Sequence, residues 1–435
     1  MMDKKMKYGN LEIDIPVHEK NVIQVIKSNK FEVTKSEDQI IQDAIEHPTD
    51  SARLKELVHS GETVCIVIPD VTRAWQRTDK YLSHLVDEIN AGGVQDKDIT
   101  FLSATGTHRR QTAEEHEKLL GKELSKRFKV IDHDCLDKDS LVYLGKTNYG
   151  TPVSINKIAL NCDHIVITGG IIYHFLVGWS GGKKTILPGI ASYETIMANH
   201  ALSLSKDFGG GTYPTVRSGN IENNPVHIDM LEAASFVKPD FMFNVVVDKD
   251  GNIVGAVSGN YISAHAKGRQ MVDDKDGVNI SKKADITIAT AGGYPKDINL
   301  YQSIKTMINA RTATKDNGTV IILSECSEGL GGDEEMQSML LNFDTSEERE
   351  KDLRNKYSIS KYVGYYFCES ADKFNVILVS SLNPDLLKRT NITVVKTIEE
   401  ALELAYKTNS KDATITLMPQ AANTLPKITG SNNAF

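Results

Sequence analysis

Short hydrophobic runs recur along the chain and alternate with segments of helical periodicity. Uninterrupted, largely β-branched runs at 63–70, 99–104 and 165–167 predict strands that are buried on both faces. Between the first two, residues 78–91 have a helical pattern, and a capping region opens a second helix at 111–120. Strands that alternate with helices in this way predict an α/β fold with a largely parallel sheet.

The same alternation returns in the second half of the chain, after a charged stretch without a pattern at 270–283. We therefore expect two α/β domains, 1–272 and 273–418, with an active-site cleft between them. Residues 419–435 form a tail without a pattern, which either packs back on the first domain or frays. Further predicted elements are a first strand at 8–16, a helical region at 36–59, a loop at 207–224, a hairpin at 241–257, strands at 284–290, 319–323, 374–379, 392–395 and 413–418, and helices at 300–310 and 398–407.

Composition excludes several classes of protein. Of 435 residues, 40% are hydrophobic and 25% charged, which is typical of a globular protein. The net charge of −8 argues against a nucleic-acid partner, and no apolar run approaches the roughly 20 residues that span a bilayer. The N-terminus lacks the apolar core of a secretion signal. Five scattered cysteines without a CxxC pair suggest reduced thiols in a cytoplasmic protein.

Polar side chains follow three successive strands, at the point where each strand ends. Asp70 and Arg73 follow the first, His108 the second, and His174 and Lys184 the third. Because ligands of open α/β sheets bind at the carboxyl ends of the strands, we expect these side chains to form one site. Each also has an ordinary structural reading: Asp70 as a helix cap, and either histidine as a core or surface residue.

A glycine-rich loop, Gly178–Lys184, lies at the centre of this region. Its spacing does not fit the P-loop motif, because Lys183 stands where the second glycine is required. Such a turn can still bind an anion, or it can simply expose two lysines to solvent. His200 lies near the end of the following helix and has no second metal-binding residue at helical spacing.

The first helix of the second domain carries Tyr301, Gln302 and Lys305. The four-residue spacing places Tyr301 and Lys305 on one helix face, and a cleft between domains would turn that face toward the first set.

Taken together, these segments resemble the nickel-dependent lactate racemase family and its superfamily of 2-hydroxyacid racemases and epimerases. The similarity covers nearly the whole chain in the same order, and the combination is specific although no single segment is. The matching segments are Asp70–Arg73, Gly106–Arg109, His174 with Gly178–Lys184, His200, and Gly292–Asp297 continuing into Leu300–Lys305.

The resemblance implies a cofactor, pyridinium-3-thioamide-5-thiocarboxylic acid mononucleotide, a nickel pincer made by separate enzymes. It implies a thioamide link to Lys184 and a nickel ion bound by His200, with the remaining sulfur and carbon donors supplied by the cofactor. A square-planar donor set of this kind fits Ni(II).

The resemblance also implies the other roles. His108 and His174 would act as paired acid/base groups, one for each enantiomer of a 2-hydroxy acid, while a hydride moves to the cofactor and back through a 2-keto acid. Arg73, Gln302 and Lys305 would bind the substrate, and Asp70 and Tyr301 would contact the cofactor. Neither the oligomeric state nor the loading of cofactor is set by the sequence, and a homo-oligomer is compatible with it.

Two local differences from the family pattern concern the substrate. Arg73 is followed by Ala74–Arg77 instead of Pro-x-Pro, and Gly364–Tyr366 replaces a tryptophan expected near 365. We therefore expect Trp75, Gln76 and Arg77 to line a pocket for a larger or more polar acid, such as malate, an aromatic hydroxy acid or a sugar acid.

Two other functions are compatible with parts of the pattern. A nicotinamide-dependent 2-hydroxyacid dehydrogenase would use the same hydride chemistry, but the chain lacks a GxGxxG between a strand and a helix. A non-enzymatic hydroxyacid-binding or cofactor-carrying protein would not need paired acid/base groups.

Overall fold

The structure, a computed structural model, describes residues 4–428 and divides into two compact units. The N-terminal unit contains Phe31–Ser203 and Thr215–Val272. The C-terminal unit contains the chain up to Lys30, Leu204–Pro214, and the chain from Asp273 onward. The division expected after residue 272 coincides with a unit boundary. The first 30 residues and residues 204–214, in contrast, belong to the C-terminal unit and not to the expected first domain.

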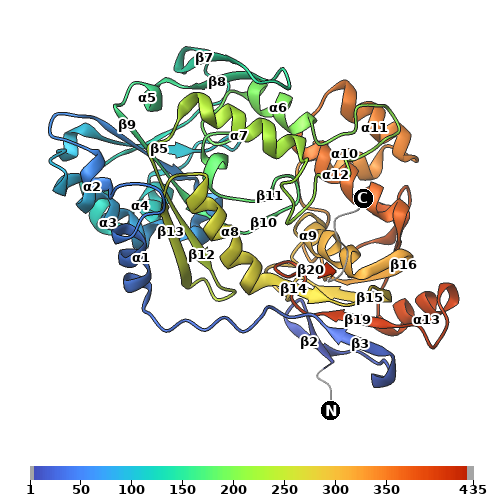
Figure 1. Cartoon of the computed structure of the whole chain (residues 1–435). Coiled ribbons are helices and arrows are strands. Elements are labelled where there is room, and N and C mark those ends of the chain that lie inside the picture. Colours follow the sequence, from blue (N-terminus) through green and yellow to red (C-terminus); the bar gives the residue numbers. More distant parts are fainter. Residues whose placement is uncertain (1–3, 429–435) are drawn as a thin grey trace. The chain divides into compact units, whose positions relative to one another are not determined.

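The N-terminal unit is built on a six-stranded sheet of order β13-β12-β9-β4-β5-β6 (Figure 1). All neighbouring strands are parallel except the β12–β13 hairpin. Its strands are β4 (Val64–Pro69), β5 (Ile99–Ala104), β6 (Val130–Asp132), β9 (His164–Gly170), β12 (Phe241–Val247) and β13 (Ile253–Gly259). Its longer helices are α1 (Glu37–Glu46), α3 (Thr78–Ala91), α4 (Ala113–Arg127), α7 (Pro225–Val237) and α8 (Ser263–Asp276).

Strand β4 lies in the interior of this sheet, and all six of its residues are buried. That explains its uninterrupted apolar sequence, because a parallel strand is covered on both faces. On one face, Ile66 and Ile68 share a core with Leu85 and Val86 of α3. The helix buries a stripe of residues at three- and four-residue spacing, so its amphipathic pattern is satisfied by the sheet.

The strand order reverses beside β4. The chain continues from β4 to β5 and β6 on one side, and then returns to β9 on the other side. At such a switch point the connections leave in opposite directions and open a crevice at the carboxyl ends of the strands. The segments that follow β4, β5 and β9 are the ones that carry Asp70, His108 and His174.

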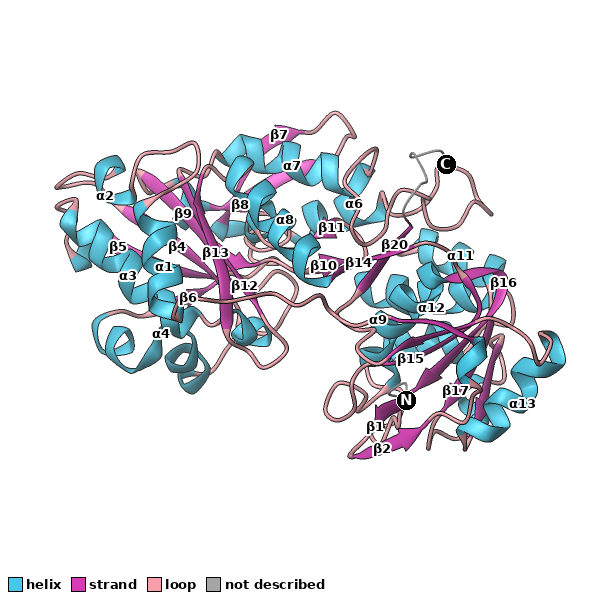
Figure 2. Ribbon diagram, turned by 60° about the horizontal axis from the view of Figure 1, so that its bottom comes forward, coloured by secondary structure: helices cyan, strands magenta, loops and turns pink. Residues whose placement is uncertain are grey.

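The C-terminal unit has a second six-stranded sheet, of order β18-β17-β16-β15-β19-β3, in which all neighbours are parallel. Helices lie against this sheet as they do in the other unit (Figure 2). Its strands are β3 (Val22–Val25), β15 (Ala284–Thr290), β16 (Thr314–Leu323), β17 (Asn375–Val379), β18 (Ile392–Val395) and β19 (Ile415–Met418). Its helices are α9 (Leu300–Ala310), α10 (Glu334–Leu341), α11 (Ser346–Asn355), α12 (Ile359–Lys373) and α13 (Ile398–Thr408).

Two distant segments complete the C-terminal unit. Strand β3, from the beginning of the chain, pairs with β19 at the sheet edge. The segment Leu204–Pro214 is held by helix side chains: the backbone N–H groups of Gly209 and Thr212 donate to Glu350 at 3.1 Å and Glu369 at 3.0 Å. Neither pairing could be predicted from local pattern, because each joins residues more than a hundred positions apart.

Several predicted elements differ from the structure. The single strand expected at 8–16 is a hairpin of β1 (Lys5–Tyr8) and β2 (Leu11–Asp14), because Gly9 takes φ +53° and turns the chain. The stretch at 270–283 is ordered: α8 runs to Asp276, and β14 (Gly277–Ile280) pairs with β20 (Leu425–Ile428). That pairing keeps the described part of the tail within the C-terminal unit. Residues 429–435 of the predicted tail lie outside the described residues.

The remaining elements of the N-terminal unit are short. They are α2 (Leu54–Leu57), η2 (Val71–Gln76), β7 (Leu141–Lys146), β8 (Pro152–Asn156), α5 (Lys157–Leu160), β10 (Tyr173–His174), β11 (Gly178–Trp179), η5 (Gly182–Thr185) and α6 (Tyr193–Ala201). Within residues 4–428, no helix is both long and apolar enough to cross a membrane.

Candidate active site

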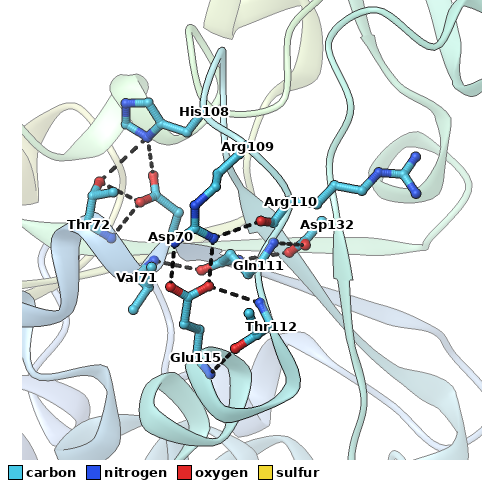
Figure 3. A network of polar contacts seen from close by, with 10 residues as sticks. All are labelled: Asp70, Val71, Thr72, His108, Arg109, Arg110, Gln111, Thr112, Glu115 and Asp132. Atoms are coloured by element: carbon cyan, nitrogen blue, oxygen red, sulfur yellow. Dashed lines mark hydrogen bonds and ion pairs between the residues drawn. The ribbon is translucent and has the colours of Figure 1, made fainter. Parts of the chain in front are cut away.

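Asp70 and His108 form a hydrogen-bonded pair at the ends of β4 and β5 (Figure 3). The Nδ1 atom of His108 lies 2.9 Å from Oδ2 of Asp70, while Oδ1 accepts from the backbone N–H of Thr72 at 2.7 Å. Burial raises the pKa of Asp70, but the hydrogen bonds from His108 and Thr72 outweigh it, so the pKa is lowered overall. The carboxylate therefore orients the imidazole, with Nδ1–H as the donor and Nε2 unprotonated.

The residue after His108 is paired with a different carboxylate. Arg109 makes a bidentate ion pair with Glu115, at 2.8 and 2.7 Å, on the first turn of α4 (Figure 3). Nearby, Gln111 accepts a hydrogen bond from the backbone N–H of Val71 at 2.6 Å and so joins the two strand ends. His108 itself is 40% exposed, so its free Nε2 edge is accessible.

A second pair, His174 and Lys184, follows β9. The Nζ atom of Lys184 lies 2.9 Å from Nε2 of His174. The backbone N–H of Leu176 donates to Nδ1 of the same ring at 3.2 Å, so Nδ1 is unprotonated. The proton of the neutral ring is then on Nε2 and points at the lysine amine. Such a contact requires a neutral amine as acceptor.

The surroundings of Lys184 favour that neutral form. Burial, followed by the positive charges of Arg73 and Lys183, lowers its pKa to about 7. The residue as a whole is half-buried, so part of Lys184 faces solvent. A lysine with these properties is a nucleophile near neutral pH.

The loop that carries Lys184 depends on glycine. Gly181 has φ +78°, and a Cβ atom there would lie 2.4 Å from Oδ1 of Asn244. That same oxygen accepts the backbone N–H of Gly182 at 2.8 Å and holds the start of η5. Asn244 lies on β12, is fully buried, and was not predicted as a site residue because nothing in its local sequence distinguishes it from a core position.

His200 is buried on α6, with 3% of its surface exposed. Its Nδ1 donates to the carbonyl of Ile196 at 2.9 Å, which leaves Nε2 as an unprotonated lone pair. Burial, together with the charge of Lys184, lowers the pKa of His200 to about 3. A neutral imidazole fixed by a backbone carbonyl is the arrangement of a metal ligand.

Residues 4–428 contain no group of three or more His, Cys, Asp or Glu side chains placed to hold a metal ion. A metal bound by His200 would therefore need donors that are not protein side chains of these types. The available groups fit an organometallic cofactor: a neutral amine at Lys184 and one imidazole lone pair whose pKa responds to that amine.

The structure brings together the predicted residues of the N-terminal unit. Asp70 pairs with His108, His174 with Lys184, and the charge of Arg73 lowers the pKa of both Asp70 and Lys184. Tyr301, Gln302 and Lys305 lie on α9 of the C-terminal unit. All three are exposed, whereas Ser303 and Ile304 between them are buried, so they mark the solvent side of that helix.

The residues expected to enlarge the substrate pocket have structural partners, and their role in the choice of substrate stays a prediction. Arg77 takes φ +56°, donates to the carbonyl of Gly251 at 2.6 Å and pairs with Glu37 at 3.7 Å. Trp75 packs against the hydrophobic core of the unit. Gln76 is 6% exposed, and its Oε1 atom has no hydrogen-bond partner among the described residues.

The second local difference from the family pattern, at residues 364–366, also involves buried side chains. Tyr365 and Tyr366 are each 1% exposed, within α12. The hydroxyl of Tyr365 lies 3.5 Å from Glu350, and that of Tyr366 accepts from Arg311. These tyrosines therefore stabilise the helical part of the C-terminal unit.

Comparison with known proteins gives the same family for both units. The description "Lactate racemase N-terminal domain" matches residues 8–209, and "Lactate racemase C-terminal domain" matches residues 279–425. The lactate racemase of Thermoanaerobacterium thermosaccharolyticum is 33% identical over 431 residues, covering 98% of this chain and 99% of the relative. That of Lactiplantibacillus plantarum is 33% identical over 400 residues, covering 90% and 91%.

Solved structures agree in fold. The lactate racemase apoprotein from Thermoanaerobacterium thermosaccharolyticum superposes with a TM-score of 0.87 at 32% identity, covering 97% of this chain and 99% of the other. A Thermotoga maritima protein superposes with a TM-score of 0.63 at 17% identity, covering 92% of this chain and all of the other, and shows the fold alone. The first similarity extends over both units and nearly the whole length, so the chain belongs to the lactate racemase family of isomerases.

Proposed function

We propose that this protein racemises a short 2-hydroxy acid, with lactate as the first candidate, on a nickel-pincer nucleotide attached to Lys184. The observation that carries the proposal is the neutral amine of Lys184 beside His174. An amine whose pKa is about 7 can be joined to a carbonyl or thioacid group at the pH of the cell. The names of the relatives support lactate, and one relative is known as an apoprotein.

Lys184 and His200 would hold the cofactor. Lys184 would supply the amide-type nitrogen, and the Nε2 lone pair of His200 would bind nickel. When bound, the group would supply an acceptor that takes a hydride from C2 of the substrate and returns it. Separate enzymes would have to make the cofactor and deliver it to this chain. The amine of Lys184 would already be in its neutral, nucleophilic form when the cofactor is attached.

The two histidines would move the hydroxyl proton of the substrate. His108 has an unprotonated Nε2 because Asp70 holds its Nδ1–H, so it can accept a proton. His174 is the proposed partner on the other face, and the proton of its neutral ring lies on Nε2 because Nδ1 accepts from Leu176. One imidazole would take the hydroxyl proton and the other would take part in returning it, which suits a reaction that runs in both directions.

Binding of the substrate carboxylate is assigned to Arg73, whose guanidinium makes one hydrogen bond within residues 4–428, of 3.2 Å to Thr72. Gln302 and Lys305 remain proposed substrate contacts, and Tyr301 a proposed cofactor contact, because their side chains are exposed on α9. Asp70 is reassigned from cofactor contact to positioning residue, since both of its oxygens are engaged by Thr72 and His108.

A label at C2 tests this function. The chain, produced together with the enzymes that make the cofactor, is given L-lactate carrying deuterium at C2 in ordinary water. Hydride return predicts that the D-lactate formed keeps the deuterium, and that no nicotinamide nucleotide is needed. Loss of the label to solvent would point to direct proton removal. Pyruvate formation that depends on added NAD would favour the dehydrogenase.

A further inference from the structure

Lys183, the neighbour of Lys184, is the starting point because its amine is buried without a hydrogen-bond partner. The side chain is 3% exposed, and Nζ contacts no acceptor within residues 4–428. A buried amine without a hydrogen-bond partner is unfavourable, and its ammonium form is more unfavourable than its neutral form. Such a group is kept where it meets a ligand that the protein alone does not provide.

The charged residues that act on Lys183 are basic. Arg269 on α8 lowers the pKa of Lys183, which burial has already lowered, to about 7. Lys183 and Arg269 in turn lower the pKa values of His227 on α7 and His265 on α8. Helix α7 packs against η5, which carries Lys183, so three separate elements direct basic side chains at one place.

Further donors face the same place. The indole ring of Trp179 lies under the guanidinium of Arg269, with 5.3 Å from Cζ to the ring centre. Trp179 is 5% exposed, and its Nε1–H, which can only donate, has no partner among the described residues. Buried hydrogen-bond donors without an acceptor are the groups that line an anion-binding site.

The two histidines near Lys183, His227 and His265, are held in place by hydrogen bonds to the backbone of the loop. His265 lies 2.8 Å, through Nε2, from the carbonyl of Ser180, and a Cβ atom at Gly182 would come within 3.0 Å of its ring. His227 hydrogen-bonds the backbone of Val177. The two rings therefore hold the loop on both sides of Trp179, shortly before Lys183. The arrangement is preorganised, which reduces the entropy lost when a ligand binds.

We propose that Lys183, Arg269 and Trp179 form an internal site for an oxyanion of the phosphate class. Donors from the loop and from α8 suit a tetrahedral anion, which accepts from several directions at once. Phosphate has two sources here: the free ion, or the phosphate group of a nucleotide whose other end reaches Lys184. The adjacent lysines would then have different roles. Lys184 would bond covalently to the cofactor, and Lys183 would bind the anion.

The test compares the apoprotein with Lys183→Met, which keeps the apolar stem and removes the amine. The control is Lys267→Met on the solvent side of α8, where the side chain is exposed. Binding of inorganic phosphate is followed by calorimetry and by the rise in melting temperature. We expect phosphate to stabilise the wild type and the control alike, and its affinity for Lys183→Met to fall at least about tenfold.

A second contrast separates an anion site from a lysine that is merely buried. Without phosphate, Lys183→Met should melt no lower than the wild type, because it removes a buried amine that has no hydrogen-bond partner. With phosphate, the order should reverse. Equal stabilisation of both proteins by phosphate, or none of the wild type, would overturn the proposal. If Lys183→Met does not fold, Arg269→Gln gives the same comparison.

A nucleotide arm distinguishes the sources and alone rests on the proposed cofactor. Nicotinic acid mononucleotide lacks the sulfur needed for a thioamide, so its binding is independent of racemisation. Tighter binding of this nucleotide than of phosphate, lost in Lys183→Met, assigns the site to the cofactor. Binding of phosphate alone assigns it to the free ion. If neither phosphate nor the nucleotide binds through Lys183 but the chain racemises lactate, the oxyanion site is refuted and the proposed function is unaffected.

Discussion

The Nε2 atom of His174 and the Nζ atom of Lys184 lie 2.9 Å apart, and the N–H of Leu176 fixes which of them carries the shared proton. With Nδ1 of the ring occupied as an acceptor, Nε2–H must be the donor and the amine the acceptor. An amine can accept only when it is neutral, and burial and the charge of Arg73 lower its pKa accordingly. The Nε2–H tautomer of His174 and the neutral form of the Lys184 amine therefore stabilise each other.

Lys184 should react with acylating reagents at a pH where other lysines do not. Its pKa of about 7 means that the amine is protonated below this pH and nucleophilic above it. Competitive acylation of the apoprotein, read by peptide mass spectrometry, should therefore show an inflection near pH 7 at Lys184. A free lysine derivative in the same reaction should show the usual inflection at about 10.

The Arg73→Gln variant tests the cause of this shift. Removing one positive charge should move the inflection at Lys184 to higher pH, because Arg73 has the largest effect of any charge on its pKa after burial. An inflection for Lys184 near 10 in the wild type would contradict the assignment of a neutral amine.

Asp70→Asn should impair racemisation while leaving the fold intact. The amide can no longer hold the Nδ1–H tautomer of His108, so Nε2 loses its role as base. We expect kcat to fall by roughly 10²–10⁴-fold, as for other orienting carboxylates, with little change in KM. Steady-state kinetics in both directions give this split.

Glu115→Gln is the matched control for Asp70→Asn. It removes the neighbouring ion pair to Arg109, in which His108 takes no part. Its activity should stay near that of the wild type. Comparable losses in the two variants would assign the effect of Asp70→Asn to general disturbance of the strand ends.

His200→Ala should separate metal binding from cofactor attachment. The variant loses the only imidazole lone pair assigned to nickel, while the amine of Lys184 is retained. We expect the purified variant to keep a mass increase at Lys184 but to contain nickel only at background level by elemental analysis. In the wild type, nickel should stay bound well below pH 6, because the pKa of His200 is about 3. Full nickel content in the variant would refute the assignment.

Arg77→Ala should change stability and leave the choice of substrate unchanged. The side chain bonds to Gly251 and pairs with Glu37, so we expect a loss of about 1 kcal/mol in unfolding free energy. Relative rates on lactate, malate, an aromatic hydroxy acid and a sugar acid should match those of the wild type, with lactate preferred. A variant that changes this order would return Arg77 to the substrate pocket.

Local pattern predicted the elements that are buried on both faces. The strands around Val67 and Leu102 and the helix that ends at Ala91 were predicted within one or two residues, because parallel strands and amphipathic helices leave direct signals. The turn at Gly9 and helix α8 were not, since short turns and charged helices carry weaker signals.

The strand ends were predicted as a site because topology brings such ends together, and the pairs Asp70–His108 and His174–Lys184 are in hydrogen-bond contact. The basic cluster was not predicted. Lys183 was noted only as part of the loop, and its neighbours lie on α7 and α8, which were not expected as helices. Its signal is an unpartnered buried amine, which exists only in three dimensions.

The central claim is that Lys184 carries the cofactor. The most direct measurement is the intact mass of the chain purified from cells that make the nickel-pincer nucleotide, followed by peptide mapping. We expect a mass increase confined to the peptide that contains Lys184, in a preparation that racemises lactate. The same increase should be absent from the Lys184→Ala variant. An active preparation whose Lys184 is unmodified would contradict it.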